Sequence, residues 1–220
     1  MSMTTHHCAE KARRVPRGEK RREEIAAVAE RVFLSRGFTE TTMQIIAEEA
    51  GASKETLYRH FGSKEGLFSD VIRSRSARIT GGNDGNLPAE GSPREILCDL
   101  GLSLLRFLVS PNSLSLYRAI VAEVPREPEL GRIFYSQGPG RLLDQFARYL
   151  ASATQCGKLC CPEPELAAKL FLGSVVANHQ ILSLVSPNRE AFSDLKMQAH
   201  VNEAVSMFLA RYGGCSAERG

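Results

Sequence analysis

The segment Met43–Phe61 constrains the fold most, because its spacing is that of two short helices crossing at a tight turn. Ala47 stands four residues before Gly51, and Leu57 stands six residues after it. A small side chain lets two helices approach each other, a glycine suits the turn, and a leucine fills the crossing. The segment therefore predicts a helix-turn-helix. The alternative is a plain helical hairpin with a solvated polar face.

Helical periodicity continues on both sides of this segment. Upstream, apolar residues recur at the spacing of one helix face and end before Gly37: Ile25, Val28, Ala29, Val32 and Phe33. Downstream, Ser63 is a favoured residue type for starting a fourth helix, expected over 64–79. With the two helices of the central segment, these predict a three-helix unit followed by a longer fourth helix.

The rest of the chain also has the pattern of helices, with no β alternation and no internal repeat. A stretch rich in glycine, proline and asparagine, residues 81–93, predicts a loop. Beyond it we expect helices over residues 94–109, 113–123, 140–155, 163–185 and 193–212. The predicted fold class is all-α. The predicted parts are a basic arm (1–19), a helix-turn-helix domain (20–65) and a larger helical domain (66–215).

Charge is uneven along the chain, although the whole carries a formal net charge of only +3. Residues 11–22 hold seven Lys and Arg against one acidic residue, Glu19. A basic arm ahead of a helix suits contact with phosphate, and a solvated tail fits the same composition. The charge pattern is thus compatible with nucleic-acid binding without requiring it.

In a helix-turn-helix, the second helix enters the major groove with its N-terminal end toward the bases. That end consists of Ser53, Lys54, Glu55 and Thr56. Lys54 can donate to guanine or phosphate, and Thr56 can contact a thymine methyl group or a phosphate. Further along, Tyr58 and His60 can donate to phosphate. We therefore expect the chain to bind double-stranded DNA.

These residues resemble the TetR/AcrR family of regulators, closely and continuously over about residues 20–72. The resemblance includes the run Tyr58-x-His60-Phe61 and the residues Ser63, Lys64 and Glu65 that follow. It implies phosphate contacts by Thr42, Tyr58, His60 and Lys64, and base contacts by Gln44, Ser53, Lys54 and Thr56. It also implies a palindromic operator, a fourth helix that leads to a ligand-binding and dimerisation domain, and repression relieved by a ligand. Residues 114–210 resemble, less specifically, the C-terminal domain of the AefR-like branch.

The expected helix 163–185 is apolar on more than one face, so it is expected to be buried on several sides. It can join the expected helix 193–212 in a four-helix interface across a two-fold axis, or it can be the core helix of a monomer. A homodimer is expected, because two half-sites need two recognition helices. The candidate interface residues are Leu172, Val176, Val205 and Phe208.

A small apolar ligand of unknown identity is the expected effector, bound among the C-terminal helices. Most candidate lining residues are large and apolar, and two are polar residues within an apolar helix: Leu104, Phe107, Leu108, Tyr117, Phe134, Phe146, Phe171, Asn178 and His179. Buried polar groups need partners, and a ligand can be one. The alternative is that most of these side chains are ordinary core, and that His179 is a core or interface histidine.

Several classes are disfavoured. No nucleophile-elbow, Walker A, dinucleotide-binding or zinc-protease pattern occurs, so we expect no enzyme and no cofactor. The cysteines Cys156, Cys160 and Cys161 lack metal-ligand spacing, so no metal is expected, although a redox role stays open. No apolar run approaches the ~18 residues of a membrane span, and no secretory signal is visible, so we expect a cytoplasmic protein without membrane contact. The alternative is a DNA-binding regulator controlled by a protein partner or by cysteine redox state.

Overall fold

The computed structural model describes residues 17–81, 86–88, 90–186 and 192–214, and these contain eleven helices. The described ranges contain an isolated bridge between Leu159 and Gly213 but no strand. This confirms the all-α class. The helices are α1 (Arg17–Arg36), α2 (Met43–Glu49), α3 (Lys54–Phe61), α4 (Lys64–Ala77), α5 (Pro93–Val109), α6 (Pro111–Glu123), α7 (Pro128–Gln137), α8 (Pro139–Gln155), α9 (Pro164–Val176), α10 (His179–Val185) and α11 (Asp194–Tyr212).

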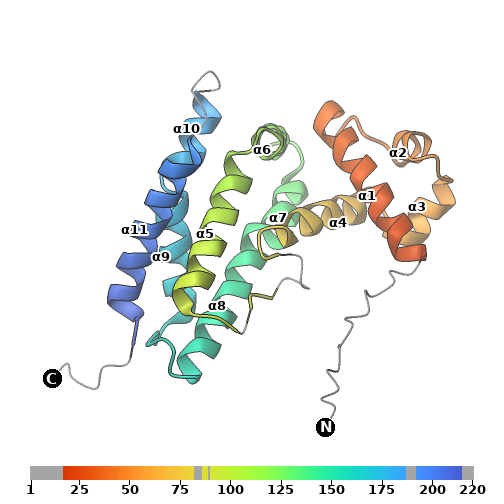
Figure 1. The fold of residues 1–220 in the computed structure, drawn as a ribbon. Coiled ribbons are helices and arrows are strands. Elements are labelled where there is room, and N and C mark those ends of the chain that lie inside the picture. The colour runs from red at the N-terminus through yellow and green to blue at the C-terminus, as the bar shows by residue number, and fades with distance from the viewer. Residues whose placement is uncertain (1–16, 82–85, 89, 187–191, 215–220) are drawn as a thin grey trace, which may run out of the picture.

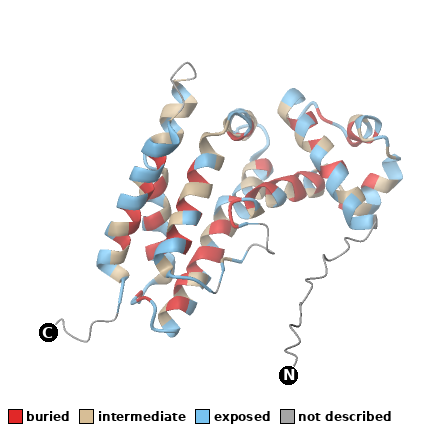
Figure 2. Cartoon of the chain, viewed as in Figure 1, coloured by how far each residue is buried: buried red, intermediate tan, exposed pale blue. Residues whose placement is uncertain are grey.

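The helices form two groups joined by α4 (Figure 1). Helices α1–α3 make an N-terminal unit at one end of the molecule, and α4 runs from this unit toward the C-terminal helices α5–α11. Within the second group α5, α8, α9 and α11 pack side by side. Helix α4 packs on α1 at one end and on α7 and α8 farther along, and it is buried over much of its length (Figure 2). It therefore belongs to both groups.

Local sequence signals explain where the helices start. The hydroxyls of Thr42, Ser53 and Ser63 accept hydrogen bonds from the backbone N–H three residues on, which caps α2, α3 and α4. Helices α5–α9 all carry proline in their first turn, where the missing N–H costs nothing. Prolines in this half of the chain thus begin helices.

Two expectations about the helices are wrong. Helix α7 was not predicted, since no helix was expected between residues 123 and 140, whereas Pro128 is the first residue of one. The single helix expected over 163–185 is two helices, α9 and α10, which break at Ala177 with φ 34° and ψ −129°. Alanine rarely adopts a positive φ, and the apolar pattern runs on across this position, so the sequence carried no sign of the break.

Some expectations fall partly outside the described residues. The structure does not describe residues 1–16, which hold most of the expected basic arm, or residues 82–85 and 89 within the expected loop. Arg17, the next basic residue, is already in α1. The fourth helix ends at Ala77, two residues earlier than expected.

Buried apolar residues form two clusters rather than one. The first joins α1–α4 to Leu116 and Ile120 of α6 and Leu130 of α7, and the second joins α5, α8, α9 and α11. Ile72 of α4 belongs to the first cluster, and Ile79, just beyond the end of α4, belongs to the second. The core of the N-terminal unit therefore extends past residue 65 into the C-terminal helices.

Candidate DNA-binding and ligand-binding sites

Helices α2 and α3 meet as the sequence spacing predicts. Ala47 and Leu57 are both buried at the crossing, and Gly51 adopts φ +54° in the turn. The side chain of Arg21 on α1 donates hydrogen bonds to the carbonyl oxygens of Ala50 and Gly51, at 2.9 and 2.8 Å. The sequence analysis counted Arg21 only as part of a basic run. In the structure this arginine fixes the turn of the helix-turn-helix to α1.

The residues expected at the bases lie at the starts of α2 and α3. Gln44, Ser53 and Lys54 are exposed, and Thr56 is half-buried. Three of these side chains have local partners: Gln44 donates to Glu48 at 2.6 Å, and the hydroxyls of Ser53 and Thr56 lie 2.8 Å apart. The Lys54 ammonium lies 6.0 Å from the centre of the Tyr58 ring. These weak local contacts can be exchanged for contacts with bases.

The residues expected at phosphates differ in exposure and in the contacts that they already make. Thr42 and Tyr58 are exposed, and His60 is half-buried beside the Phe61 ring. The Lys64 ammonium donates to the carbonyl of Phe38 at 2.9 Å and lies 4.2 Å from the centre of the Phe38 ring. Lys64 therefore places a positive charge beside the first turn of α4 and also ties α4 to the end of α1.

A carboxylate from α6 holds the loop that follows α1. Glu123 accepts hydrogen bonds from the backbone N–H of Phe38 and Thr39, both at 2.7 Å, and from the Thr39 hydroxyl at 2.8 Å. A Cβ at residue 37 would overlap this carboxylate, and Gly37, at φ +78°, leaves the space free. The N-terminal unit is thus fastened to α6 by a charged group as well as by the covalent path through α4.

A cavity of about 380 Å³ lies where α4 enters the C-terminal helices. Five of the nine expected ligand-lining residues border it: Leu104, Phe107, Leu108, Tyr117 and Phe134. The wall also includes residues that the sequence analysis missed, among them Ile72, Arg75 and Ser76 of α4 and Gln180 of α10. An amphipathic pattern cannot show which side of a buried helix borders an empty space.

The other four expected lining residues lie elsewhere. Phe146 and Phe171 are fully buried in the core, where their ring centroids are 5.3 Å apart. Asn178 is exposed beside the break between α9 and α10, and the His179 ring lies 4.4 Å from that of His200. The break at Ala177 explains why Asn178 and His179 do not line the cavity, because the sequence analysis placed both on one straight helix.

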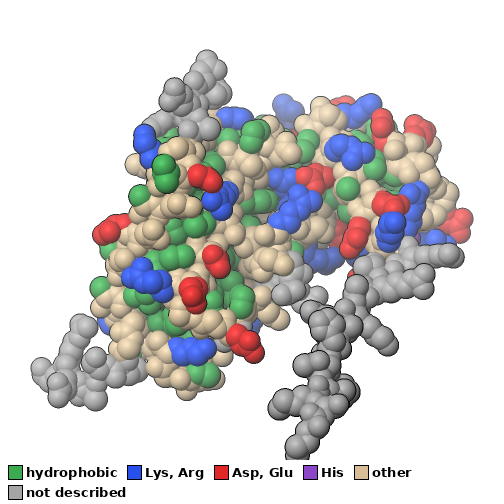
Figure 3. Space-filling model, viewed as in Figure 1, with side chains coloured by type: hydrophobic (Ala, Val, Ile, Leu, Met, Phe, Trp, Pro, Cys, Tyr) green, Lys and Arg blue, Asp and Glu red, His purple; other side chains and the backbone are tan. Residues whose placement is uncertain are grey.

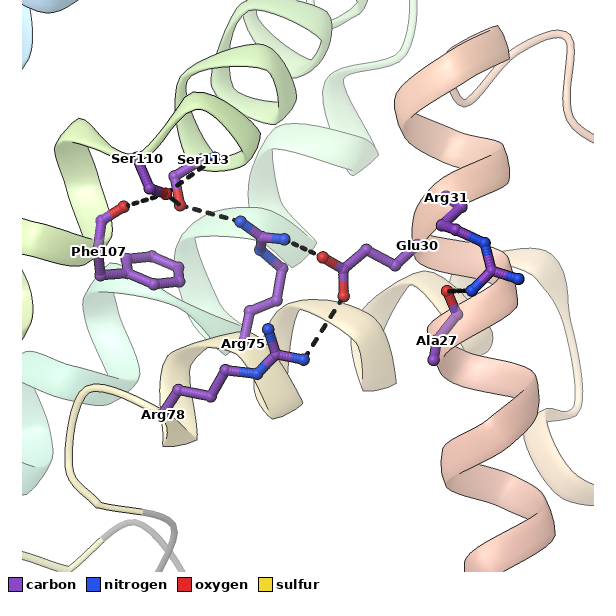
Figure 4. A network of polar contacts seen from close by, with 8 residues as sticks. All are labelled: Ala27, Glu30, Arg31, Arg75, Arg78, Phe107, Ser110 and Ser113. Carbon is purple, nitrogen blue, oxygen red and sulfur yellow. Dashed lines mark hydrogen bonds and ion pairs between the residues drawn. The ribbon is translucent and has the colours of Figure 1, made fainter.

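Arg75 is the charged residue among the cavity-lining residues that the structure describes, and it is 4% exposed. Its guanidinium donates to the carboxylate of Glu30 on α1 and, at 2.9 Å, to the hydroxyl of Ser113 on α6 (Figure 4). It also lies 5.3 Å from the centre of the Phe107 ring. Burial lowers the pKa of Arg75, and the charge of Glu30 opposes that shift.

Two family models match the chain. The model described as bacterial regulatory proteins, tetR family, matches residues 25–71, and the AefR-like transcriptional repressor C-terminal domain matches residues 95–214. The chain belongs to the TetR family of transcriptional regulators. Members bind operator DNA and act as dimers, and the family consists of regulators and not of enzymes.

Individual relatives agree with this assignment over most of their length. The HTH-type transcriptional regulator YezE of Bacillus subtilis is 25% identical over 179 residues, which cover 80% of this chain and 90% of the relative. A TetR-family regulator structure from Mesorhizobium loti matches with a TM-score of 0.71 at 29% identity, covering 90% of this chain and all of the other. The flavonoid-responsive regulator FrrA matches with a TM-score of 0.69 at 26% identity, covering 90% and 99%.

The four expected dimer residues of this TetR-family chain differ in burial. Val205 and Phe208 are buried within the protomer, and Leu172 and Val176 border the cavity. The outward faces of the same two long helices instead expose large apolar side chains, including Leu166 and Leu170 of α9 and Met207 of α11. The expected interface stays a prediction, and these exposed side chains add candidate residues on α9 and α11 to it.

The described residues of this TetR-family chain include four of its six cysteines. Cys98, Cys156, Cys160 and Cys161 are free thiols, and burial raises the pKa of Cys98 and of Cys161. Cys8 and Cys215 lie outside the described residues. Among the residues described, no group of three or more His, Cys, Asp or Glu is placed to hold a metal ion.

No single helix among the described residues is long and apolar enough to cross a bilayer. Taken together, α9 and α10 reach that length and apolar composition, with a bend of 45° between them.

Proposed function

We propose that this TetR-family regulator is a repressor that leaves a palindromic operator when a small, largely apolar molecule enters the cavity. The observation that carries the proposal is the position of the cavity at α4. Ile72, Arg75 and Ser76 of α4 border it, and only two residues separate the start of this helix from the end of α3. The AefR-like repressor description of the matched C-terminal domain and the name of FrrA support repression and a ligand response.

On this proposal α3 enters the major groove. Ser53, Lys54 and Thr56, with Gln44 of α2, read bases, while Thr42, Tyr58, His60 and Lys64 contact phosphates. Exposure of Lys54 and Tyr58 and the weak local bonds of Gln44 and Ser53 favour these roles. Binding two half-sites requires a dimer with recognition helices ~34–36 Å apart. We propose that the regulator acts in the cytoplasm, where bacterial operator DNA lies.

The proposed dimer contact is the outward apolar face of α9 and α11. Leu166 and Leu170 are four residues apart on α9, so they lie on one face of that helix, with exposed fractions of 46% and 58%. Met207 of α11 is 56% exposed. Hydrophobic side chains are visible between charged ones on the α11 side of the molecule (Figure 3). Helices presenting large apolar side chains to solvent suit burial against a second copy.

A ligand can weaken operator binding only if it prefers a conformation in which the recognition helices are wrongly spaced. Filling the cavity would move α4 relative to α5, α7 and α8, because these helices form its wall. The N-terminal unit would then follow α4. We expect a coupling of ~1–3 kcal/mol, or roughly 5–150-fold in operator affinity.

The test begins with an operator selected from a random duplex library and measured by fluorescence anisotropy. Ligand candidates that raise the melting temperature are then titrated by calorimetry into the free dimer and into the operator complex. Linkage requires DNA to weaken ligand binding by the factor by which ligand weakens DNA binding. Equal ligand affinity in both titrations would refute release by ligand and would favour control by a protein partner or by cysteine oxidation.

A further inference from the structure

The wall of the cavity is mostly apolar, yet it contains one buried positive charge on the helix that leads to the DNA-binding unit. Arg75 is 4% exposed and lies against the cavity beside Phe107. Removing an arginine from water is costly unless charged or polar groups replace its hydration. In this structure Glu30 and Ser113 supply the replacement.

The guanidinium has more donors than these partners use. An arginine carries five N–H donors in a planar fork, and the recorded hydrogen bonds to Glu30 and Ser113 use two of them. A carboxylate or another planar anion is the group that matches this fork best. A ligand that lies against Phe107 and carries one anionic group could therefore reach Arg75 from the cavity.

Glu30, the partner that such a ligand would displace from Arg75, has a second cation close by. The Arg78 guanidinium lies 3.8 Å from its other carboxylate oxygen. The Arg78 side chain is 65% exposed, whereas that of Arg75 is 5% exposed. Glu30 can thus exchange the buried arginine for the exposed one without being left as an unpaired charge.

We infer that the cavity takes an apolar molecule bearing one anionic group, and that this group binds Arg75 in place of Glu30. This inference rests on the proposed ligand-binding function of the cavity and adds the chemical class of the ligand. Glu30 belongs to α1 and Ser113 to α6, and Arg75 lies between the stretches that the two family models match. Replacing the Glu30 contact would therefore remove a direct bond between α1 and the C-terminal end of α4.

The test compares straight-chain carboxylates of eight to ten carbons with the alcohols of the same length. Each is titrated by calorimetry into the wild-type dimer. We expect the carboxylate to bind about tenfold or more tightly than its alcohol, as charge-assisted hydrogen bonds require. Only the carboxylates should lower operator affinity markedly.

Variants then separate a ligand contact from a purely structural role. Arg75→Gln should remove the preference for carboxylate over alcohol. Glu30→Gln should strengthen carboxylate binding several-fold, because it removes the competitor and leaves Arg75 in place. Arg78→Gln should weaken carboxylate binding, because it removes the cation that Glu30 would turn to. Arg106→Gln is the control and should preserve the preference, since Arg106 pairs with Asp194 on the surface and is not among the cavity-lining residues.

The outcomes are distinguishable. If Arg75→Gln does not fold, the double variant Glu30→Gln/Arg75→Gln, which leaves neither charge unpaired, replaces it. Equal binding of carboxylates and alcohols, or weaker carboxylate binding by Glu30→Gln, would overturn the inference and leave the cavity as an apolar ligand site. Failure of both series to bind wild type would overturn both the inference and the proposed ligand-binding function.

Discussion

The two ends of α4 lie in different surroundings. Near its start, Phe68 packs against Phe33 and Phe38, with ring centroids 5.3 to 5.6 Å apart, and fills the core of the DNA-binding unit. Near its end, Arg75, Ser76 and the following Ile79 border a cavity of about 380 Å³. Close-packed aromatic rings resist rearrangement, whereas side chains beside a cavity can move at little cost. One helix thus joins a unit that moves as a whole to a region that can repack.

The largest expected effect tests this contrast with the same substitution in the packed core of α4 and on the cavity wall of α5. Leu67→Ala, at a fully buried position of α4, should lower the free energy of unfolding by ~3–5 kcal/mol. Leu108→Ala, at a half-buried position on the cavity wall, should cost only about 1 kcal/mol, because that side chain already lacks neighbours on one side. Urea unfolding at one fixed protein concentration measures both. Equal losses in the free energy of unfolding would show that the core near the start of α4 and the cavity wall are equally well packed.

The second prediction concerns the proposed dimer contact of the C-terminal helices. If α9 and α11 pair across a two-fold axis, Leu170→Glu would bury an unpaired charge and weaken the dimer by about 3 kcal/mol or more. Val121→Glu is the control, since Val121 is also an exposed apolar residue but lies on α6. Light scattering at micromolar concentration should show monomers for Leu170→Glu and dimers for Val121→Glu. A monomeric wild-type protein would refute the proposed dimer, and the opposite pattern would place the interface elsewhere.

The third prediction divides the DNA-binding surface itself. Lys54→Ala should cost ~1–3 kcal/mol on the preferred operator and relax the choice of base at one position. Lys64→Ala should weaken binding to all sequences alike and reduce the salt dependence by about one unit. Anisotropy titrations on the selected operator and a scrambled duplex, over a range of salt, measure both effects. A uniform loss for both variants would show that the assigned reading and positioning roles are wrong.

The same contrast explains how much could be predicted from the sequence. The helix-turn-helix follows from neighbours along the chain: Ala47, Gly51, Ser53 and Leu57 lie within eleven residues and fix the local geometry. The all-α class was equally accessible, because helical periodicity is a local signal. The break at Ala177 was not, since its φ of 34° is imposed by surroundings that no local pattern records.

The cavity shows why the remaining site residues were only partly predicted. Its wall combines residues from each of the helices α4–α10, so membership depends on how distant segments meet. Large apolar residues such as Phe107 and Phe134 were found by type, but Phe146 shares that type and lies in the core. Arg75 was missed because its partners Glu30 and Ser113 are 45 and 38 residues away along the chain.

The smallest expected effect is at Glu123, the second contact between α6 and the DNA-binding unit. Its carboxylate accepts hydrogen bonds from the backbone N–H of both Phe38 and Thr39. An amide has one acceptor oxygen where the carboxylate has two, so Glu123→Gln should release one of these N–H groups and expose the pair to local opening. Hydrogen bonds to charged groups contribute ~1.5–3 kcal/mol, and partial retention by the amide should reduce the loss to about 1 kcal/mol. Hydrogen exchange at residues 38 and 39 should then be about fivefold faster, with the core amides around Phe33 unchanged.

Glu127→Gln, at an exposed position just beyond α6, is the control and should leave exchange at residues 38 and 39 as in wild type. Faster exchange throughout α1–α3 would instead mean that the DNA-binding unit depends on α6 for its stability, and it would no longer be a unit that moves as a whole.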